Sequence, residues 1–195
     1  GQDGVARIWE VSTGTRQDPH ARRQGNVAVI WNPAGTRFAV KTQGSPTAGV
    51  WDARVGARLY TLVHSAGGEI RDLAWSPDGT RLVTGSEDGI KIWGEGGALV
   101  HTLDGYANKE WSLGWSPDSK RLVSHDDLGL KVWDAVGGGV LYRLENDQEG
   151  GFAAFSWSPD SRLLATVATI GEYDVAHVWD ARRGTVKYKL QGGAD

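Results

Sequence analysis

The chain has 195 residues, of which 39% are hydrophobic and 23% charged, and its formal net charge is -3. This length can bury the core of one globular domain, and the small net charge argues against a field that would hold nucleic acid or an anionic membrane. No apolar run approaches the roughly 18 residues of a membrane helix, and cysteine is absent, which excludes disulfides and thiolate metal sites. We therefore expect a cytoplasmic protein that binds neither nucleic acid nor membrane.

The first predicted element belongs to a partial unit over residues 3–18, which contains one strand, Val5–Glu10, and room for a second. Four longer units follow over residues 26–62, 69–103, 109–144 and 151–190, within a single segment, residues 1–195. In the unit 69–103, short apolar-rich strands are predicted over residues 70–75, 81–86, 90–93 and 98–103.

Tryptophan sets the period of these units, because nine of the ten tryptophans fall into two series with steps of 40 to 46 residues. The first series ends a predicted strand and comprises Trp9, Trp51, Trp93, Trp133 and Trp179. The second opens the turns WNPAG, WSPDG and WSPDS and comprises Trp31, Trp75, Trp115 and Trp157. Proline, aspartate and glycine suit such turns, and Asp88-Gly89 is a tight-hairpin signal. Four short strands per unit predict an all-β fold.

The unit W-S-P-D-G…S-x-D-G-x-x-x-W-D resembles the WD-repeat family of β-propellers, whose blades are four-stranded antiparallel sheets around a channel. The resemblance covers nearly the whole chain and implies a propeller of which only a half blade and four blades are present. The missing blades can lie in a longer chain, two copies can complete one another through open blade edges, or the four blades can close alone. The first is favoured, because the chain opens within a blade and without methionine.

The resemblance also implies that each blade can hold a hydrogen-bonded set of a His, a Ser or Thr, a hairpin Asp and the strand-ending Trp. It assigns structural roles to Trp9, Trp51, Trp93, Trp133, Trp179, Asp3, Asp88 and Asp127. The match is imperfect, since Gly-His is absent, the blade of Trp51 lacks a hairpin Asp, and Asp88 and Asp174 stand only five residues before their tryptophans. His20 and His64 stand eleven residues before the tryptophan of their turn. Since a buried polar group is costly unless it is satisfied, we expect the full set in at most two blades.

Catalytic chemistry has no candidate residues in this sequence. The histidines lie on separate units without the spacing of metal ligands, at His20, His64, His101, His125 and His177. The glycine-rich stretches follow strand-ending tryptophans, where a turn needs glycine, so they are not phosphate loops. We expect no catalytic residue, no metal and no cofactor.

Partners of WD-repeat proteins commonly bind where the first strands begin and the second-to-third hairpins protrude. Carried over to this chain, that face comprises Trp111, Arg71, Glu69, Lys109, Asp126 and Glu87. Trp111 is the leading candidate, because the repeat does not require it and tryptophan dominates interface energetics. Packing between blades is the alternative role for Trp111.

We therefore predict a non-catalytic scaffold that binds protein or peptide partners, either within a larger propeller or self-assembling through open blade edges. One alternative is the accessory propeller of a hydrolase, similar to TolB-like propellers, which rarely end the third strand in Trp-Asp as this chain does at Trp51-Asp52. Another is an engineered or excised fragment without a ligand.

Overall fold

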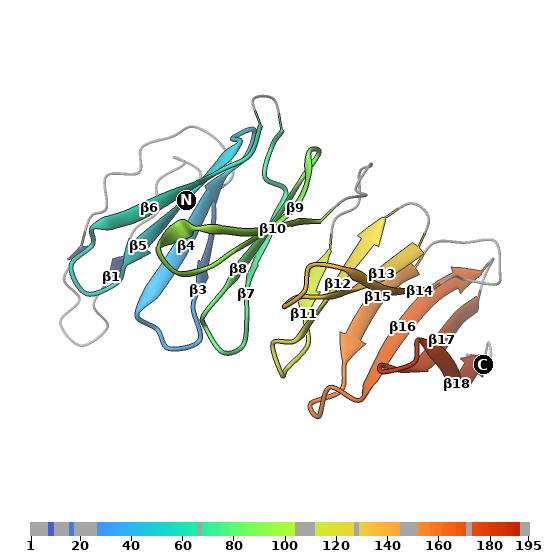
Figure 1. The fold of residues 1–195 in the computed structure, drawn as a ribbon. Coiled ribbons are helices and arrows are strands. Elements are labelled where there is room, and N and C mark those ends of the chain that lie inside the picture. Colours follow the sequence, from blue (N-terminus) through green and yellow to red (C-terminus); the bar gives the residue numbers. More distant parts are fainter. Residues whose placement is uncertain are drawn as a thin grey trace. The chain divides into compact units, whose positions relative to one another are not determined.

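The computed structural model describes residues 8–9, 16–17, 27–65, 68–103, 112–126, 129–144, 152–170 and 173–191. Apart from one short 3-10 helix, η1 (Glu95–Gly97), every regular element among these residues is a β-strand. The chain divides into two compact units, Gly1–Tyr106 and Ala107–Asp195 (Figure 1). None of the described residues forms a helix that is long and apolar enough to cross a membrane.

The first unit contains two complete four-stranded sheets and one short strand pair, β1 (Ile8–Trp9) with β2 (Arg16–Gln17). The first complete sheet consists of β3 (Val27–Trp31), β4 (Arg37–Thr42), β5 (Thr47–Asp52) and β6 (Arg58–Val63). The second consists of β7 (Asp72–Trp75), β8 (Leu82–Ser86), β9 (Gly89–Trp93) and β10 (Leu99–Leu103). Within each sheet, consecutive strands pair antiparallel.

The second unit repeats this arrangement with two further antiparallel sheets. One consists of β11 (Leu113–Trp115), β12 (Arg121–Asp126), β13 (Gly129–Asp134) and β14 (Val140–Leu144). The other consists of β15 (Phe152–Trp157), β16 (Leu163–Ile170), β17 (Tyr173–Asp180) and β18 (Thr185–Gln191). The prediction of an all-β fold built from four-stranded antiparallel blades is confirmed. The grouping of all these sheets, with the partial unit, into a single propeller segment stays a prediction.

The turn between the first two strands of each sheet is closed by its own side chains. In the WSPDG turn, the Ser76 hydroxyl accepts the Arg81 N–H at 2.9 Å and donates to Asp78 at 2.5 Å. Gly79 there has φ +70°, and the serines of the two WSPDS turns, Ser119 and Ser161, adopt φ +59°. The turn therefore keeps a left-handed residue at this position, which glycine occupies without strain.

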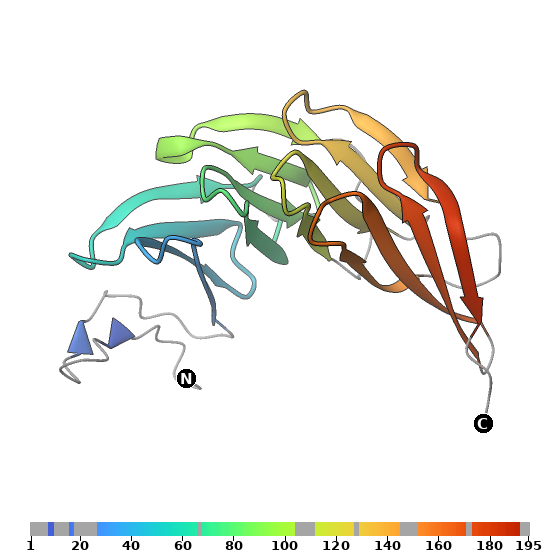
Figure 2. The same ribbon diagram turned by 90° about the horizontal axis from the view of Figure 1, so that it is seen from below.

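The core of each unit lies between its two complete sheets, which pack face against face (Figure 2). In the first unit, Val50 and Leu62 of one sheet share a fully buried cluster with Ile70 just before the other. In the second unit, Leu144 of one sheet packs with Leu164 of the other. Alternation along each strand supplies these apolar faces.

Candidate functional site

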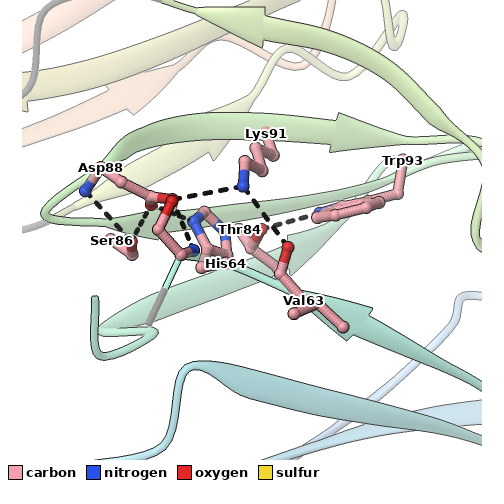
Figure 3. A network of polar contacts seen from close by, with 8 residues as sticks. Val63, His64, Thr84, Ser86, Asp88, Lys91 and Trp93 are labelled. Atoms are coloured by element: carbon pink, nitrogen blue, oxygen red, sulfur yellow. Dashed lines mark hydrogen bonds and ion pairs between the residues drawn. The ribbon is translucent and has the colours of Figure 1, made fainter. Parts of the chain in front are cut away.

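A continuous chain of hydrogen bonds runs through three buried side chains in the first unit (Figure 3). Trp93, the last residue of β9, donates its indole N–H to the Thr84 hydroxyl at 2.7 Å. The same hydroxyl lies 2.7 Å from Nε2 of His64, which directly follows β6, and the other ring nitrogen of His64 bonds the Asp88 carboxylate. These residues come from the end of one sheet and from two strands and a hairpin of the next, so the network joins neighbouring sheets.

The protonation of His64 follows from its surroundings. His64 is 3% exposed and Thr84 is fully buried. Burial lowers the pKa of His64 more than the hydrogen bond and charge of Asp88 raise it, so the ring is neutral at pH 7. A neutral ring with its proton on Nδ1 donates to Asp88 and accepts from Thr84, which satisfies every polar atom of the chain.

Asp88 lies in the two-residue turn between β8 and β9, closed by the pairing of Ser86 with Gly89. Its carboxylate accepts the backbone N–H of Ser65 at 2.8 Å and lies 3.2 Å from Lys91 Nζ. Partial burial raises the pKa of Asp88, but hydrogen bonds from Ser86, from the Ser65 backbone and from His64 lower it well below its ordinary range. The hairpin is thus anchored by a carboxylate that stays ionised.

The other sheets hold only parts of this network among their described residues. Trp133 and Trp179 each donate to a hydroxyl, on Ser124 and Thr166 respectively, at 2.9 Å. In the first complete sheet Val40 occupies the position of that hydroxyl, and Trp51 stacks on Phe38 at 6.3 Å. The described residues therefore show one full network, in the sheet β7–β10.

The other aspartates that the sequence offered for a hairpin network do not show this role in the structure. Asp174 pairs with Thr169 inside the β16–β17 ladder and is not in the hairpin loop. Asp3 and Asp127 lie outside the described residues, and of Trp9 only the strand position is described. Sequence reasoning did not single out Ser65, Ser86 or Lys91, although a serine two residues before an aspartate is a known partner for a turn.

Three residues of the predicted partner face lie together at one end of the second complete sheet. Arg71 forms an ion pair with Glu87, whose side chain is 58% exposed, while Arg71 is 30% exposed. Glu69 accepts the backbone N–H of Gly44 at 2.8 Å, and so reaches the β4–β5 hairpin of the neighbouring sheet. We call Glu69, Arg71 and Glu87 the charged rim.

The remaining residues of the predicted face are not placed beside the charged rim. Trp111 and Lys109 lie outside the described residues. Asp126 ends β12 in the second unit, and its side chain is not described. Across the part of the chain that the structure describes, no group of three or more His, Cys, Asp or Glu side chains could hold a metal ion.

Repeated four-stranded antiparallel sheets, packed face to face and carrying a Trp–Thr–His–Asp network, define a repeat protein of the β-propeller class. Two segments of the chain, residues 56–93 and 97–134, match the family described as WD domain, G-beta repeat, so the chain contains WD40 repeats. The first matched segment starts before β6 and ends at Trp93, so it contains all four residues of the network. WD40 repeat proteins are typically protein-interaction scaffolds and generally non-catalytic.

Among similar proteins, the guanine nucleotide-binding protein subunit beta of Oryza sativa subsp. japonica is 28% identical over 93 residues, covering 45% of this chain and 24% of the rice protein. Human apoptotic protease-activating factor 1 is 31% identical over 102 residues, covering 51% of this chain and 8% of the human protein. A chain in a structure entitled "Crystal Structure of Mitotic Checkpoint Complex" has a TM-score of 0.73 at 23% identity, covering 94% of this chain and 59% of that chain. The matched segment spans about a quarter of the rice relative.

Proposed function

We propose that this chain is a non-catalytic scaffold that binds protein or peptide partners at the charged rim. The observation that carries the proposal is the convergence of Glu69, Arg71 and Glu87 at one end of one sheet. WD40 proteins bind proteins, which supports a partner of this class. Trp111, Lys109 and Asp126, which belong to the second unit, stay candidates for partner contacts of that unit.

The charged rim is held in place before any partner arrives. Glu87 occupies the same two-residue turn as Asp88, which the buried network fixes to His64 and Ser65. Glu69 is fixed by the Gly44 N–H. A preorganised site loses less conformational entropy on binding, and exposed charges of both signs select a partner with the complementary pattern.

The assembly in which this scaffold works is also part of the proposal. We propose that the chain forms part of a larger propeller or self-assembles. The chain aligns with only a fraction of the length of its relatives, which is consistent with either arrangement.

A charge reversal at the rim tests partner binding. Arg71→Glu breaks the pair with Glu87 and leaves two neighbouring carboxylates, so proteins captured from a lysate and counted by mass spectrometry should fall at least tenfold. Trp111→Ala should deplete the same proteins. Arg54→Glu is the matched control, because Arg54 is exposed in the β5–β6 turn, at the other end of the sheets of the same unit. If both arginine variants capture the same proteins as the wild type, partners do not bind at the charged rim.

A further inference from the structure

The hydrogen bonds that run from Trp93 to Asp88 have one direction (Figure 3). An indole N–H can only donate, so Trp93 donates to the Thr84 hydroxyl at 2.7 Å. At the other end the ionised Asp88 carboxylate can only accept, so Nδ1 of His64 donates to it. Nε2 of His64 is then the acceptor for the Thr84 hydroxyl, at 2.7 Å. Every hydrogen of the chain therefore has an acceptor as long as Nε2 carries no proton.

A proton on Nε2 of His64 disturbs this order. The imidazolium donates from both ring nitrogens, so the Thr84 oxygen would accept from Trp93 and from His64 at once. Among the described residues, the Thr84 hydroxyl forms hydrogen bonds with these two side chains only, and Thr84 is fully buried. Protonation thus leaves the hydroxyl hydrogen of Thr84 without an acceptor, which destabilises the arrangement.

The charged side chains that act on the His64 ring within the described structure are Asp88, from the β8–β9 turn, and Lys91, from β9. Burial lowers the pKa of His64 more than the hydrogen bond and charge of Asp88 raise it. Lys91, whose Nζ lies 3.2 Å from the Asp88 carboxylate, opposes a second positive charge. The same carboxylate already accepts hydrogen bonds from Ser65 and Ser86. The attraction of Asp88 therefore does not offset the loss at Thr84.

The contacts of the His64 ring hold the β8–β9 turn to the chain after β6. The Asp88 carboxylate reaches from this turn to the His64 ring and to the N–H and hydroxyl of Ser65, at 2.8 and 2.7 Å. The pairing of β8 with β9 stops at Ser86 and Gly89, so beyond that pair the turn is fixed by side chains. A loss of the imidazole contact therefore acts on the turn first.

We propose that His64 is an acid-sensitive switch. Protonation of its Nε2 in mildly acidic solution frees the β8–β9 turn from the chain after β6, while the strands of the sheet stay paired. Glu87 lies in this turn and pairs with Arg71, so the release of the turn loosens the charged rim. The effect on a partner rests on the proposed function, whereas the release of the turn does not depend on it.

The switch is confined to the hairpin that carries the charged rim. His64 stands two residues after the buried Leu62 of β6. Gly105 and Asn146 stand at the corresponding places after β10 and β14. Neither of these residues titrates, so among these three junctions the sequence places an ionisable ring only at the one that leads into the sheet β7–β10.

Amide hydrogen exchange followed by NMR between pH 8 and pH 5 tests the switch, with each rate compared with the intrinsic rate at the same pH. The protection of the Ser65 amide, which donates to Asp88, should fall at least about threefold at pH 5 and recover at pH 8. The ceiling is about thirtyfold, because the freed ring has its ordinary pKa of about 6.5. The Ser45 amide, which donates to the Thr42 carbonyl at 3.1 Å in the neighbouring sheet, is the internal control and should keep its protection.

Three variants separate the His64 ring from general effects of acid. His64→Asn removes the titrating ring, so the protection of the Ser65 amide should be low and independent of pH. His101→Asn is the matched control, because His101 lies on β10 of the same sheet, and it should keep the wild-type pH profile. Lys91→Gln removes the charge that opposes the imidazolium, so the fall in protection should become smaller.

Three results would overturn the proposal. The first is a wild type in which the protection of the Ser65 amide does not change between pH 8 and pH 5. The second is an equal fall at Ser65 and Ser45, which would indicate global unfolding. The third is a fall of wild-type size in Lys91→Gln, a measurement that decides the question even where His64→Asn does not fold.

Discussion

Replacing Thr84 with valine tests the buried network most directly. Thr84→Val keeps the side-chain shape and removes the hydroxyl that accepts from Trp93 and bonds His64. Both partners are buried, at 6% and 3% exposure, so water does not replace the lost contacts. The variant therefore leaves one donor and one acceptor unsatisfied.

The expected loss of stability follows from these two groups. An unsatisfied buried polar group costs about 1–3 kcal/mol, so two of them cost about 2–6 kcal/mol. That is a large fraction of the roughly 5–15 kcal/mol that stabilises a typical domain. Urea unfolding followed by tryptophan fluorescence gives the loss, and hydrogen exchange of the β8 and β9 amides shows whether it is local.

Ser124→Ala provides the comparison, because the Ser124 hydroxyl accepts only the Trp133 N–H among the contacts described. It removes one partner where Thr84→Val removes two, so its cost should be about 1–3 kcal/mol. Equal losses for the two variants, or a Thr84→Val loss under about 0.5 kcal/mol, would refute the reasoning that the histidine branch stabilises the hairpin.

Three further predictions concern the pH dependence of stability and the effect of replacing glycines by alanine. Because the folded-state pKa of His64 lies below its ordinary 6.5, protonation favours the unfolded chain, and the free energy of unfolding should fall as the pH drops below about 6.5. Urea midpoints measured between pH 8 and pH 5 give this pH dependence, and His64→Asn should make it weaker. Gly68→Ala places a Cβ 2.9 Å from the Ser86 hydroxyl and should cost about 1–3 kcal/mol in the same urea assay, whereas Gly139→Ala, which meets no described atom within 4 Å, should cost well under that. Gly184→Ala should lower the melting temperature more than Gly56→Ala, because both strain a positive φ but only the first meets a tyrosine ring.

The fold was predictable because its signals are local and repeated. A turn such as WSPDG fixes its own geometry through Ser76 and Asp78, whatever the rest of the chain does. Trp75 and Trp93 recur at the same points of each unit, so the strand order follows from their spacing. Strand positions in the second sheet accordingly agree with the prediction to within two residues at each end.

The site was less predictable, because it depends on the path of the chain after β6, which carries His64, relative to the β8–β9 turn, which carries Asp88. His64 stands farther from its turn than the family pattern has it, and Asp88 stands closer to its tryptophan. The two-residue β8–β9 turn nevertheless brings Asp88 onto the His64 ring. Spacing alone could say that few sheets hold the full network, but not which one.

Pairings across sheets were not predicted at all. The contact of Glu69 with Gly44 depends on how one sheet packs on its neighbour, which no local pattern encodes. The same holds for Tyr142 over Gly184, although both residues recur at fixed positions and a comparison of fourth strands could have found them. Trp111, the leading sequence candidate for a partner contact, stays a prediction.

The strand-ending tryptophans of the first unit are held in two different ways, by a polar network in one sheet and by aromatic stacking in the other. Where the polar network closes, His64 ties the end of β6 to Thr84 and Asp88 of the next sheet, and the hairpin it fixes carries the charged rim. Where Val40 replaces the hydroxyl, Trp51 stacks on Phe38, its partner on the neighbouring strand of the same sheet. A polar network demands complete satisfaction and therefore suits a fixed recognition site, whereas an apolar face gains from any complementary cover. A change at Arg71 therefore tests the charged rim itself, whereas a change at Thr84 tests the network that fixes the hairpin below it.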